Sequence, residues 1–324
     1  MIPQNLREVE ARIEALCRDG GKESRFVVTD TDVAPLVVGF LADAPRIVVE
    51  AGESHKSIES AARIWQFLVD GGALRNSVVV NVGGGMVSDL GGFAAATFMR
   101  GIGYINVPTT LLAAVDASVG GKTGVNFAGL KNEVGAFALP MAVFPLLSLF
   151  DSLPEDEWLS GVGEALKTGL LDSEELFRLA SSEDFIVRRD PSVVEKVVSR
   201  CIAFKESVVE RDFREGGLRK ILNLGHTAGH AIESLMLSRG CPVPHGVAVA
   251  YGLETALEKS VADAGLDPSV LEDYRTVLRR YFPPLNLPES SSSDLEALMA
   301  RDKKNRKVGN PAWVLLRSIG HPLQ

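Results

Sequence analysis

The sequence is poor in cysteine, in histidine and in long apolar runs, and each shortage excludes a class of protein. Its three cysteines, Cys17, Cys201 and Cys241, are an odd number without metal-ligand spacing, so neither a disulfide framework nor a thiolate zinc site is expected. The longest apolar stretch, residues 135–150, is interrupted by two prolines and is shorter than the roughly 20 residues of a membrane span. The first residues carry no signal-peptide pattern, which predicts a cytoplasmic protein.

An excess of positive charge is missing too. With 34 Lys and Arg against 42 Asp and Glu, the net charge is -8, which disfavours nucleic acid and anionic membranes as partners but leaves room for a local basic pocket. A hydrophobic content of 46% over 324 residues is ordinary for a globular protein and is enough for two separate cores.

The two halves of the chain differ in pattern. Up to residue 150, short β-branched runs alternate with stretches of helical composition, whereas later the strand signals nearly vanish. The expected strands are 25–30, 46–50, 77–82 and 103–107, and the expected helices are 58–71, 90–98, 154–171, 193–210, 227–237, 246–264 and 268–281. This pattern predicts an α/β domain with a Rossmann-like parallel sheet at 1–150, followed by an all-helical domain at 151–324.

A glycine-rich turn, residues 83–85, follows one of the expected strands. Glycines at such a turn let the backbone approach a pyrophosphate, with helix N–H groups facing the anion. The spacing is not G-x-G-x-x-G, so nucleotide binding and a plain tight turn both stay open. A second segment, residues 120–123, is similar to the end of an ATP-binding P-loop, but Asp116 stands where that loop needs its first glycine. An ATPase is therefore excluded on spacing.

Three of the five histidines, His226, His230 and His245, fall within twenty residues. His226 and His230 are one turn apart on one face of an expected helix. A zinc protease would carry a glutamate directly after the first of them, but Thr227 stands there, so the hydrolytic base is missing. The cluster favours a metal or catalytic site, and two histidines with a carboxylate would leave zinc an open position. Spacing alone does not choose that carboxylate, because glutamates are numerous.

A series of short segments makes the prediction of function more specific, because the segments occur in one fixed order along the chain. The segments are Gly52-Glu-Ser-His-Lys56, Gly83-Gly-Gly-Met-Val-Ser-Asp89, Thr97-Phe-Met-Arg-Gly101, Pro108-Thr-Thr-Leu-Leu-Ala-Ala-Val-Asp116, Gly120-Gly-Lys-Thr123, Lys131-Asn132, Gly163-Glu-Ala-Leu-Lys167, Gly217-Leu-Arg219, Asn223-Leu-Gly-His-Thr-Ala-Gly-His230, His245-Gly246 and Asp302-Lys-Lys304. Together they resemble the dehydroquinate synthase family of sugar-phosphate cyclases from about residue 30 to 305. Each motif alone is weak, but the series in register is specific.

The resemblance implies a metal site, an NAD site and a substrate site. Zinc or cobalt would be bound by Glu164, His226 and His245, while His230 would be catalytic and contact phosphate. NAD would contact Asp30, Glu53, Lys56, Gly84, Gly85, Asp89, Thr109, Thr110, Lys122, Lys131, Ser152 and Leu153. Further catalytic residues would be Lys167, Lys205, Arg219, Asn223 and Asp116, and substrate contacts would come from Lys122, Asn132, Arg100 and one or both of Lys303 and Lys304. Arg100 would reach the phosphate in a neighbouring subunit, which implies a homodimer.

The implied activity is that of a lyase of the shikimate pathway. It would convert 3-deoxy-D-arabino-heptulosonate 7-phosphate to 3-dehydroquinate and phosphate, with NAD regenerated in each turnover. The lysines and the arginine would hold this anionic substrate inside an acidic protein. The alternatives are a cyclase acting on another heptulose or hexose phosphate, a metal-dependent polyol dehydrogenase, and a non-catalytic NAD-binding scaffold. The chain departs from the family pattern at Gly163, where alanine is frequent, and we expect this change to be mild.

Overall fold

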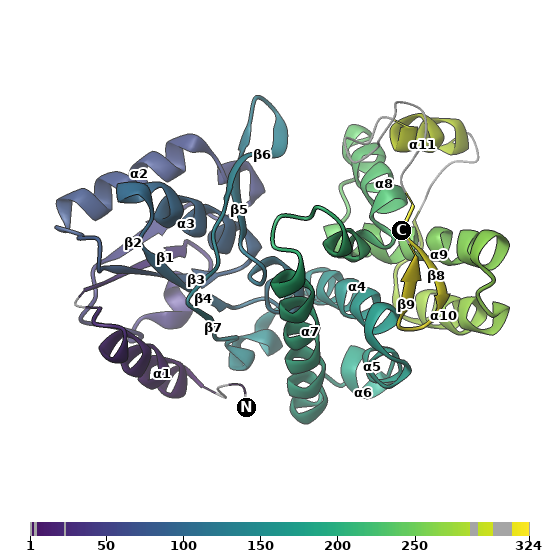
Figure 1. The fold of residues 1–324 in the computed structure, drawn as a ribbon, viewed down its shortest axis with the longest axis horizontal. Helices are drawn as coiled ribbons and strands as arrows, with labels where there is room; N and C mark the ends of the chain where they lie inside the picture. The colour runs from purple at the N-terminus through teal and green to yellow at the C-terminus, as the bar shows by residue number, and fades with distance from the viewer. Residues whose placement is uncertain (1, 3–4, 23, 286–290, 301–312, 324) are drawn as a thin grey trace. The chain divides into compact units, whose positions relative to one another are not determined.

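The chain folds into two compact units, Met1–Leu153 and Pro154–Gln324. The computed structural model describes residues 2, 5–22, 24–285, 291–300 and 313–323 (Figure 1). Among these residues, no helix is both long and apolar enough to cross a membrane. Each unit has its own elements and is described in turn.

The N-terminal unit is built on a five-stranded parallel sheet with the order β2-β1-β3-β4-β7. The strands are β1 (Arg25–Asp30), β2 (Arg46–Val49), β3 (Val78–Gly83), β4 (Gly103–Pro108) and β7 (Ala142–Val143). The four expected strands and their parallel arrangement are confirmed. The winding of the chain reverses between β1 and β3, and in such sheets ligands bind beyond the carboxyl ends of the strands at that point.

Helices cover both faces of this sheet. Val79 of β3 belongs to a core shared with α2 (Ile58–Asp70) and α3 (Gly85–Thr97), whereas Val78 and Val80 belong to a core shared with α1 (Leu6–Asp19). Successive side chains leave a strand on opposite faces, so a strand covered on both sides is expected to be largely apolar. This explains the valines Val78–Val80 of β3, while the buried Asn81 of the same strand donates to Asn106 Oδ1 at 2.9 Å.

Some elements of this unit differ from the expectation. Helix α1 is not predicted, and α3 begins at Gly85 instead of residue 90 because the glycine turn itself forms the start of the helix. The segment similar to a P-loop opens an antiparallel hairpin of β5 (Lys122–Phe127) and β6 (Leu130–Phe137). Gly121 has a φ of 66°, and a Cβ there would lie 2.4 Å from the carbonyl oxygen of Ala138. The glycine therefore serves the turn into the hairpin.

The C-terminal unit is helical apart from one short hairpin. Its helices are α4 (Glu155–Asp172), α5 (Glu174–Ala180), α6 (Glu183–Ile186), α7 (Pro191–Arg211), α8 (His226–Ser238), α9 (His245–Ala264), α10 (Pro268–Tyr281) and α11 (Ser291–Ala300). The five predicted helices are confirmed, with ends that agree within about two residues. The hairpin of β8 (Leu315–Ser318) and β9 (His321–Leu323) is not predicted. It docks on α9, where the Leu316 N–H donates to Ser260 Oγ at 2.9 Å.

Helix α4 is the central element of this unit. It is buried continuously from Trp158 to Leu171 and packs against α5, α7 and α9. Helices α8 and α9 lie side by side (Figure 1). A side chain that projects from α4 toward α8 and α9 is therefore removed from water, which is unusual for a charged residue.

Replacing Gly91 of α3 by alanine tests the close packing of this helix on the sheet. A Cβ at Gly91 would lie 1.9 Å from Oδ1 of Asn81, whose Nδ2 donates to Asn106 Oδ1 at 2.9 Å. Since this site has no room, Gly91→Ala should lower the free energy of unfolding by about 1–3 kcal/mol in urea titration. Gly39→Ala is the control, because no atom lies within 4 Å of its Cβ position. Equal stability of Gly91→Ala and the wild type would contradict the packing described.

Candidate metal centre and cofactor-binding loops

A buried carboxylate lies at the centre of the candidate metal centre. Glu164, in the middle of α4, has no exposed surface. Its Oε2 is 2.5 Å from Nζ of Lys167, which is 1% exposed and lies one turn further along the helix. Its Oε1 is 3.6 Å from Nε2 of His226 and 3.4 Å from Nε2 of His245. Because a buried charge must be paired, the lysine and the two histidines are what keep this carboxylate in the interior.

The two histidines are the first residues of two helices, α8 and α9. Nδ1 of His226 is 3.2 Å from the carbonyl oxygen of Leu224, and Nδ1 of His245 is 3.0 Å from Oε2 of Glu233. Both contacts assign the Nδ1 proton, so each Nε2 is directed toward Glu164. An imidazole whose second nitrogen is held in this way is the usual form of a metal-ligating histidine.

The charge of His245 depends on whether a metal is bound. Burial lowers the pKa of its ring, but the hydrogen bonds to Glu164 and Glu233 outweigh burial and raise the pKa to about 9. In the metal-free protein the ring is therefore cationic at neutral pH. Metal binding at Nε2 would release that proton, because ligating imidazole must be neutral.

The third histidine of the cluster lies beside the other two. Ring nitrogens of His226, His230 and His245 are all within 4.8 Å of one another. The ring centroid of His230 is 5.2 Å from that of His226 and 5.7 Å from that of His245. The structure thus places His226 and His230 on one face of α8, as their spacing predicts. Two ligand sets fit this geometry: the three histidines, or Glu164 with His226 and His245.

The donor atoms suit a divalent transition-metal ion. Two ligands that bind one tetrahedral zinc ion at about 2.0–2.2 Å lie roughly 3.4 Å from each other. The distances from Oε1 of Glu164 to the two Nε2 atoms, 3.6 and 3.4 Å, match this spacing. One carboxylate with two imidazoles favours zinc or cobalt over magnesium or calcium, which prefer oxygen ligands. The residues present therefore fit the metal that the sequence predicts.

The remaining basic and amide candidates of this unit lie on elements that pack against α4. Lys205, 8% exposed, is on α7, while Arg219, 2% exposed, and Asn223 are in the 3₁₀ turn Leu218–Asn223. Both α7 and this turn contact α4, the helix of Glu164. Lys303 and Lys304 lie outside the described residues.

Sequence reasoning does not single out the carboxylates that support these residues. Asp212 accepts hydrogen bonds from the backbone N–H groups of Arg219 at 2.9 Å, Gly217 at 2.8 Å and Gly216 at 2.9 Å. These bonds, that of Arg219 first, lower the pKa of Asp212. Glu215 accepts from Nδ2 of Asn223 at 2.8 Å. Their surroundings are created by the fold, so no local sequence signal marks them.

In the N-terminal unit, the glycine turn leaves the start of α3 open to an anion. Gly84 is the N-cap of α3 and provides no side-chain hydrogen bond to the first N–H groups. These groups are the donors that bind phosphates at helix N-termini. A Cβ at Gly84 would lie 3.3 Å from Cγ2 of Thr110, and one at Gly85 would lie 3.1 Å from Cβ of Ala117. The glycines therefore keep the turn close to the segment that follows β4.

A polar network joins expected cofactor and substrate residues from distant parts of the sequence. Lys56, 3% exposed, lies between Glu53 at 2.9 Å and Asp89 at 3.1 Å. Burial lowers the pKa of Lys56, but Asp89 and Glu53 outweigh it and raise the pKa, so the lysine is cationic. Asn126 donates through Nδ2 to the carbonyl oxygen and to Oε1 of Glu53, both at 3.0 Å, and its Oδ1 accepts from the Asn132 N–H at 3.0 Å. Sequence reasoning misses Asn126, although it connects this network.

Two further cofactor candidates lie at carboxyl ends of strands. Asp30 ends β1, and its Oδ1 accepts from the N–H groups of Asp32 at 3.0 Å and Val33 at 2.8 Å. Burial raises the pKa of Asp30. Thr109 follows β4 and donates its N–H to the carbonyl oxygen of Gly83 at 3.0 Å. This is the edge of the sheet at which the strand order predicts a ligand.

The other N-terminal candidates lie on turns and on the hairpin. Asp116 is in the π-helical turn Ala113–Ala117, Lys122 and Lys131 are on β5 and β6, and Ser152 and Leu153 are at the end of the unit. Arg100 is exposed and has a left-handed φ of 69° next to Met99 with 49°. Two consecutive residues in this region hold the arginine in a strained turn, and such strain is often found where a side chain is presented to a ligand or partner.

Comparison with known proteins covers both units. Models of the N-terminal and C-terminal parts of 3-dehydroquinate synthase match residues 46–160 and 161–305. The 3-dehydroquinate synthase of Parabacteroides distasonis is 44% identical over 301 residues, which cover 91% of this chain and 85% of that protein. That of Geobacter metallireducens is 40% identical over 325 residues, covering 95% and 88%.

Solved structures with the same fold include two cyclases and a dehydrogenase. A 2-deoxy-scyllo-inosose synthase in complex with carbaglucose-6-phosphate, NAD⁺ and Co²⁺ has a TM-score of 0.84 at 26% identity and covers 100% of this chain and 89% of its own. A 2-epi-5-epi-valiolone synthase from Streptomyces hygroscopicus with NAD⁺ and Zn²⁺ has a TM-score of 0.82 at 26% identity, covering 94% and 87%. A probable glycerol dehydrogenase from Sinorhizobium meliloti, 15% identical with a TM-score of 0.63 over 90% and 87%, shares the fold alone. With both family models matched and relatives at 40–44% identity along nearly its whole length, this chain belongs to the 3-dehydroquinate synthase family.

Proposed function

We propose that this protein is a 3-dehydroquinate synthase, a lyase that converts 3-deoxy-D-arabino-heptulosonate 7-phosphate to 3-dehydroquinate and phosphate. The observation that carries the proposal is the match of both family models over residues 46–305, together with relatives of that name at 40–44% identity. The buried cluster around Glu164 supports it, because its donors fit the divalent metal that the solved cyclases hold.

NAD⁺ and a divalent metal, Zn²⁺ or Co²⁺, belong to this proposal. Glu164, His226 and His245 are the proposed ligands, supported by the 3.4 and 3.6 Å spacing of their donor atoms. When bound, the metal would supply a Lewis acid for a substrate hydroxyl and NAD would supply a reversible hydride acceptor, for a reaction that comprises transient oxidation, phosphate elimination, re-reduction and intramolecular aldol closure. Substrate binding and proton transfer would be carried out by side chains of the protein.

The substrate is proposed to be held by basic and amide side chains. Lys167 pairs with Glu164 at 2.5 Å and is a buried lysine beside a proposed metal ligand. His230 is half-buried beside the two histidine ligands, where an imidazole nitrogen can contact phosphate and move a proton. The other proposed contacts are Lys205, Arg219, Asn223, Asp116, Lys122, Asn132, Lys303 and Lys304. The proposed substrate carries both a carboxylate and a phosphate, which explains the need for these lysine and arginine side chains in an otherwise acidic protein.

NAD is proposed to bind along the carboxyl edge of the parallel sheet. The uncapped start of α3 would receive the pyrophosphate, and the network of Glu53, Lys56 and Asp89 lies on neighbouring segments. The remaining proposed contacts are Asp30, Gly84, Gly85, Thr109, Thr110, Lys122, Lys131, Ser152 and Leu153. The two-domain division at 1–150 and 151–324 and a cytoplasmic location complete the proposal.

A phosphate-release assay tests the function directly. With 3-deoxy-D-arabino-heptulosonate 7-phosphate, NAD⁺ and zinc, we expect release of phosphate, 3-dehydroquinate as product and no net change at the NADH absorption band. His226→Ala should abolish turnover together with bound metal, whereas His321→Ala, which changes an exposed histidine of β9, should leave both intact. Release from a heptulose or hexose phosphate without a carboxylate would assign another cyclase, and accumulating NADH from a polyol would assign a dehydrogenase.

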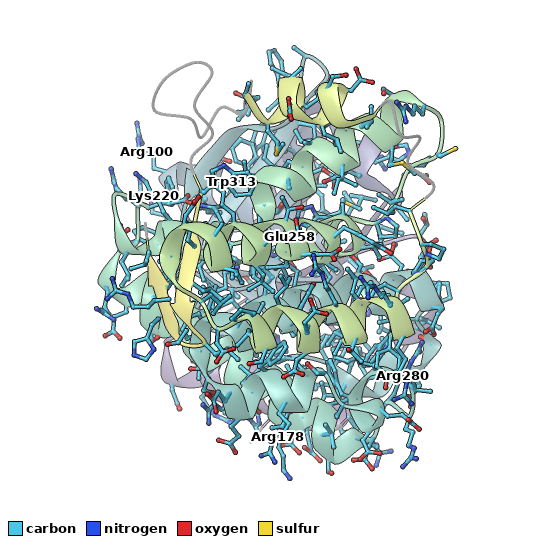
Figure 2. The ribbon with its side chains drawn as sticks, turned by 90° about the vertical axis from the view of Figure 1, so that its right-hand side faces the viewer. Arg100, Arg178, Lys220, Glu258, Arg280 and Trp313 are labelled. Carbon is cyan, nitrogen blue, oxygen red and sulfur yellow. The ribbon has the colours of Figure 1, made fainter. Side chains whose placement is uncertain are left out.

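Glu233 should be needed for tight metal binding. It holds Nδ1 of His245 at 3.0 Å, and loss of such a supporting carboxylate typically weakens metal binding by about 10–100-fold. Glu233→Ala should show this loss in competition with a chromophoric chelator. Glu258→Gln is the control, because this exposed glutamate of α9 pairs with Arg275 on the outer helical face (Figure 2). Unchanged affinity in Glu233→Ala would remove Glu233 from the metal centre.

A homodimer in which Arg100 completes the neighbouring site is part of the proposal, supported by the exposed, strained turn that carries this arginine. Mixing inactive Arg100→Ala with inactive His226→Ala tests it. Random pairing should restore about a quarter of the wild-type activity, since half of the dimers are mixed and each has one complete site. If the mixture stays inactive although the subunits exchange, Arg100 does not act across the dimer.

A further inference from the structure

One side chain of the N-terminal unit makes hydrogen bonds both to a proposed cofactor contact and to a proposed substrate contact. Asn126, on β5, donates from Nδ2 to the backbone carbonyl oxygen and to Oε1 of Glu53, both at 3.0 Å. Its Oδ1 accepts from the backbone N–H of Asn132 on β6 at 3.0 Å. Glu53 is a proposed NAD contact and Asn132 a proposed substrate contact. Asn126 therefore bridges the two proposed sites.

These contacts require an amide at position 126. Nδ2 faces two oxygen atoms and Oδ1 faces an N–H group, so the partners assign the orientation of the amide. An aspartate of the same size would have no donor for Glu53 and would place a second negative charge beside it. An alanine would lose all three hydrogen bonds.

The backbone of β5 is shaped so that this side chain can reach both partners. The register of the hairpin shifts between Val125 and Phe127, which places Asn126 at an irregularity of the ladder. Such bulges re-aim a side chain and are common beside functional sites. The Asn126 N–H also donates to the carbonyl oxygen of Lys56 at 2.7 Å. Because this backbone bond does not depend on the side chain, substitution of Asn126 should leave β5 in place and remove only the bridge.

Both ends of the bridge are held in defined positions. Oε1 of Glu53 accepts from Asn126 Nδ2 at 3.0 Å and from Lys56 Nζ at 2.9 Å, so two donors orient this carboxylate. Asn132 has a left-handed φ of 56°, a conformation that is uncommon for residues other than glycine. The bond from its N–H to Asn126 stabilises that conformation. A change in the position of Glu53 is therefore passed through one amide to the backbone of Asn132.

We propose that Asn126 is a positioning residue that couples the NAD site to the substrate site. NAD bound at Glu53 fixes the amide and thereby Asn132, and a substrate bound at Asn132 fixes Glu53 in the same way. This inference rests on the proposed function and its contacts. Because coupling between two binding sites is reciprocal, each ligand should tighten the binding of the other by the same factor.

ADP-ribose, the part of NAD that lacks nicotinamide, allows this coupling to be measured without turnover. It accepts no hydride, so the substrate stays intact, and it has no nicotinamide that could contact the substrate. Its affinity for the full-length, zinc-loaded protein is measured by titration calorimetry with and without saturating 3-deoxy-D-arabino-heptulosonate 7-phosphate. We expect the substrate to tighten ADP-ribose binding by about fivefold or more in the wild type. In Asn126→Ala and in Asn126→Asp the factor should fall below about twofold, and the aspartate keeps the size of the side chain, so lost packing does not explain its effect.

Leu130→Ala is the matched control in the same hairpin. Leu130 is 57% exposed and lies opposite Phe127, so the substitution removes a contact between β5 and β6 without removing any of the three hydrogen bonds of Asn126. It should keep the coupling of the wild type. The inference is overturned if the wild type shows no coupling, if Asn126→Ala keeps it, or if Leu130→Ala loses it equally.

Steady-state kinetics give a second measurement that does not depend on ADP-ribose. Asn126→Ala should raise the KM for NAD and the KM for the substrate by about threefold or more each, with kcat within about twofold of the wild type. Leu130→Ala should keep all three values, and unchanged KM values in Asn126→Ala would count against the inference. If the wild type releases no phosphate, the proposed function falls and the inference with it. If the wild type turns over and Asn126→Ala matches it in coupling and KM, the inference alone falls.

Discussion

The C-terminal unit depends on the pairing of one charged carboxylate that has no contact with water. Moving an ionised carboxylate out of water carries a penalty of several kcal/mol even after relaxation. Glu164 meets it with Lys167 at 2.5 Å on one oxygen and with two imidazoles at 3.4 and 3.6 Å on the other. The two histidines come from α8 and α9, which must approach α4 closely, whereas Lys167 lies one turn further along α4 itself. The packing of the unit and the chemistry of its centre therefore rest on the same requirement.

The N-terminal unit arranges charge differently. It leaves backbone N–H groups uncapped at the start of α3, where an anionic group can bind. Beside them, Lys56 is kept cationic between Glu53 and Asp89. Asn126 links these residues to the β5–β6 hairpin. An anion bound at the start of α3 would need little rearrangement of the protein, because the N–H groups are already fixed there, directly after β3.

Most of the fold could be predicted because its periodicity is strong. The buried strands read as β-branched runs, and the long helices α7 and α10 bury residues at helical spacing on one face, whereas α4 is buried continuously from Trp158 to Leu171. The start of α3 could not be predicted, since three glycines carry no helical preference, and neither could the two hairpins, whose alternation is short.

Only part of the candidate site could be predicted from the amino-acid sequence. The spacing of His226 and His230 predicts one shared face, and the structure places both there. No spacing rule selects Glu164 among many glutamates, because its role depends on α4 being buried against α9. Glu233, Asp212 and Asn126 escape sequence reasoning for the same reason. Their importance arises from contacts that exist only in the folded chain, between Asn126 and Glu53, between Glu233 and His245, and between Asp212 and Gly217.

The central claim is that Glu164 shares one metal ion with two histidines, and a crystal structure of the zinc-loaded protein with anomalous scattering at the zinc edge tests it most directly. The account predicts one zinc ion at about 2.0–2.2 Å from Oε1 of Glu164 and from Nε2 of His226 and His245. The ring nitrogens of His226, His230 and His245 lie within 4.8 Å of one another, so the main alternative is a zinc site formed by these three histidines. Zinc bound by those three, with Glu164 left on Lys167 alone, would contradict the account.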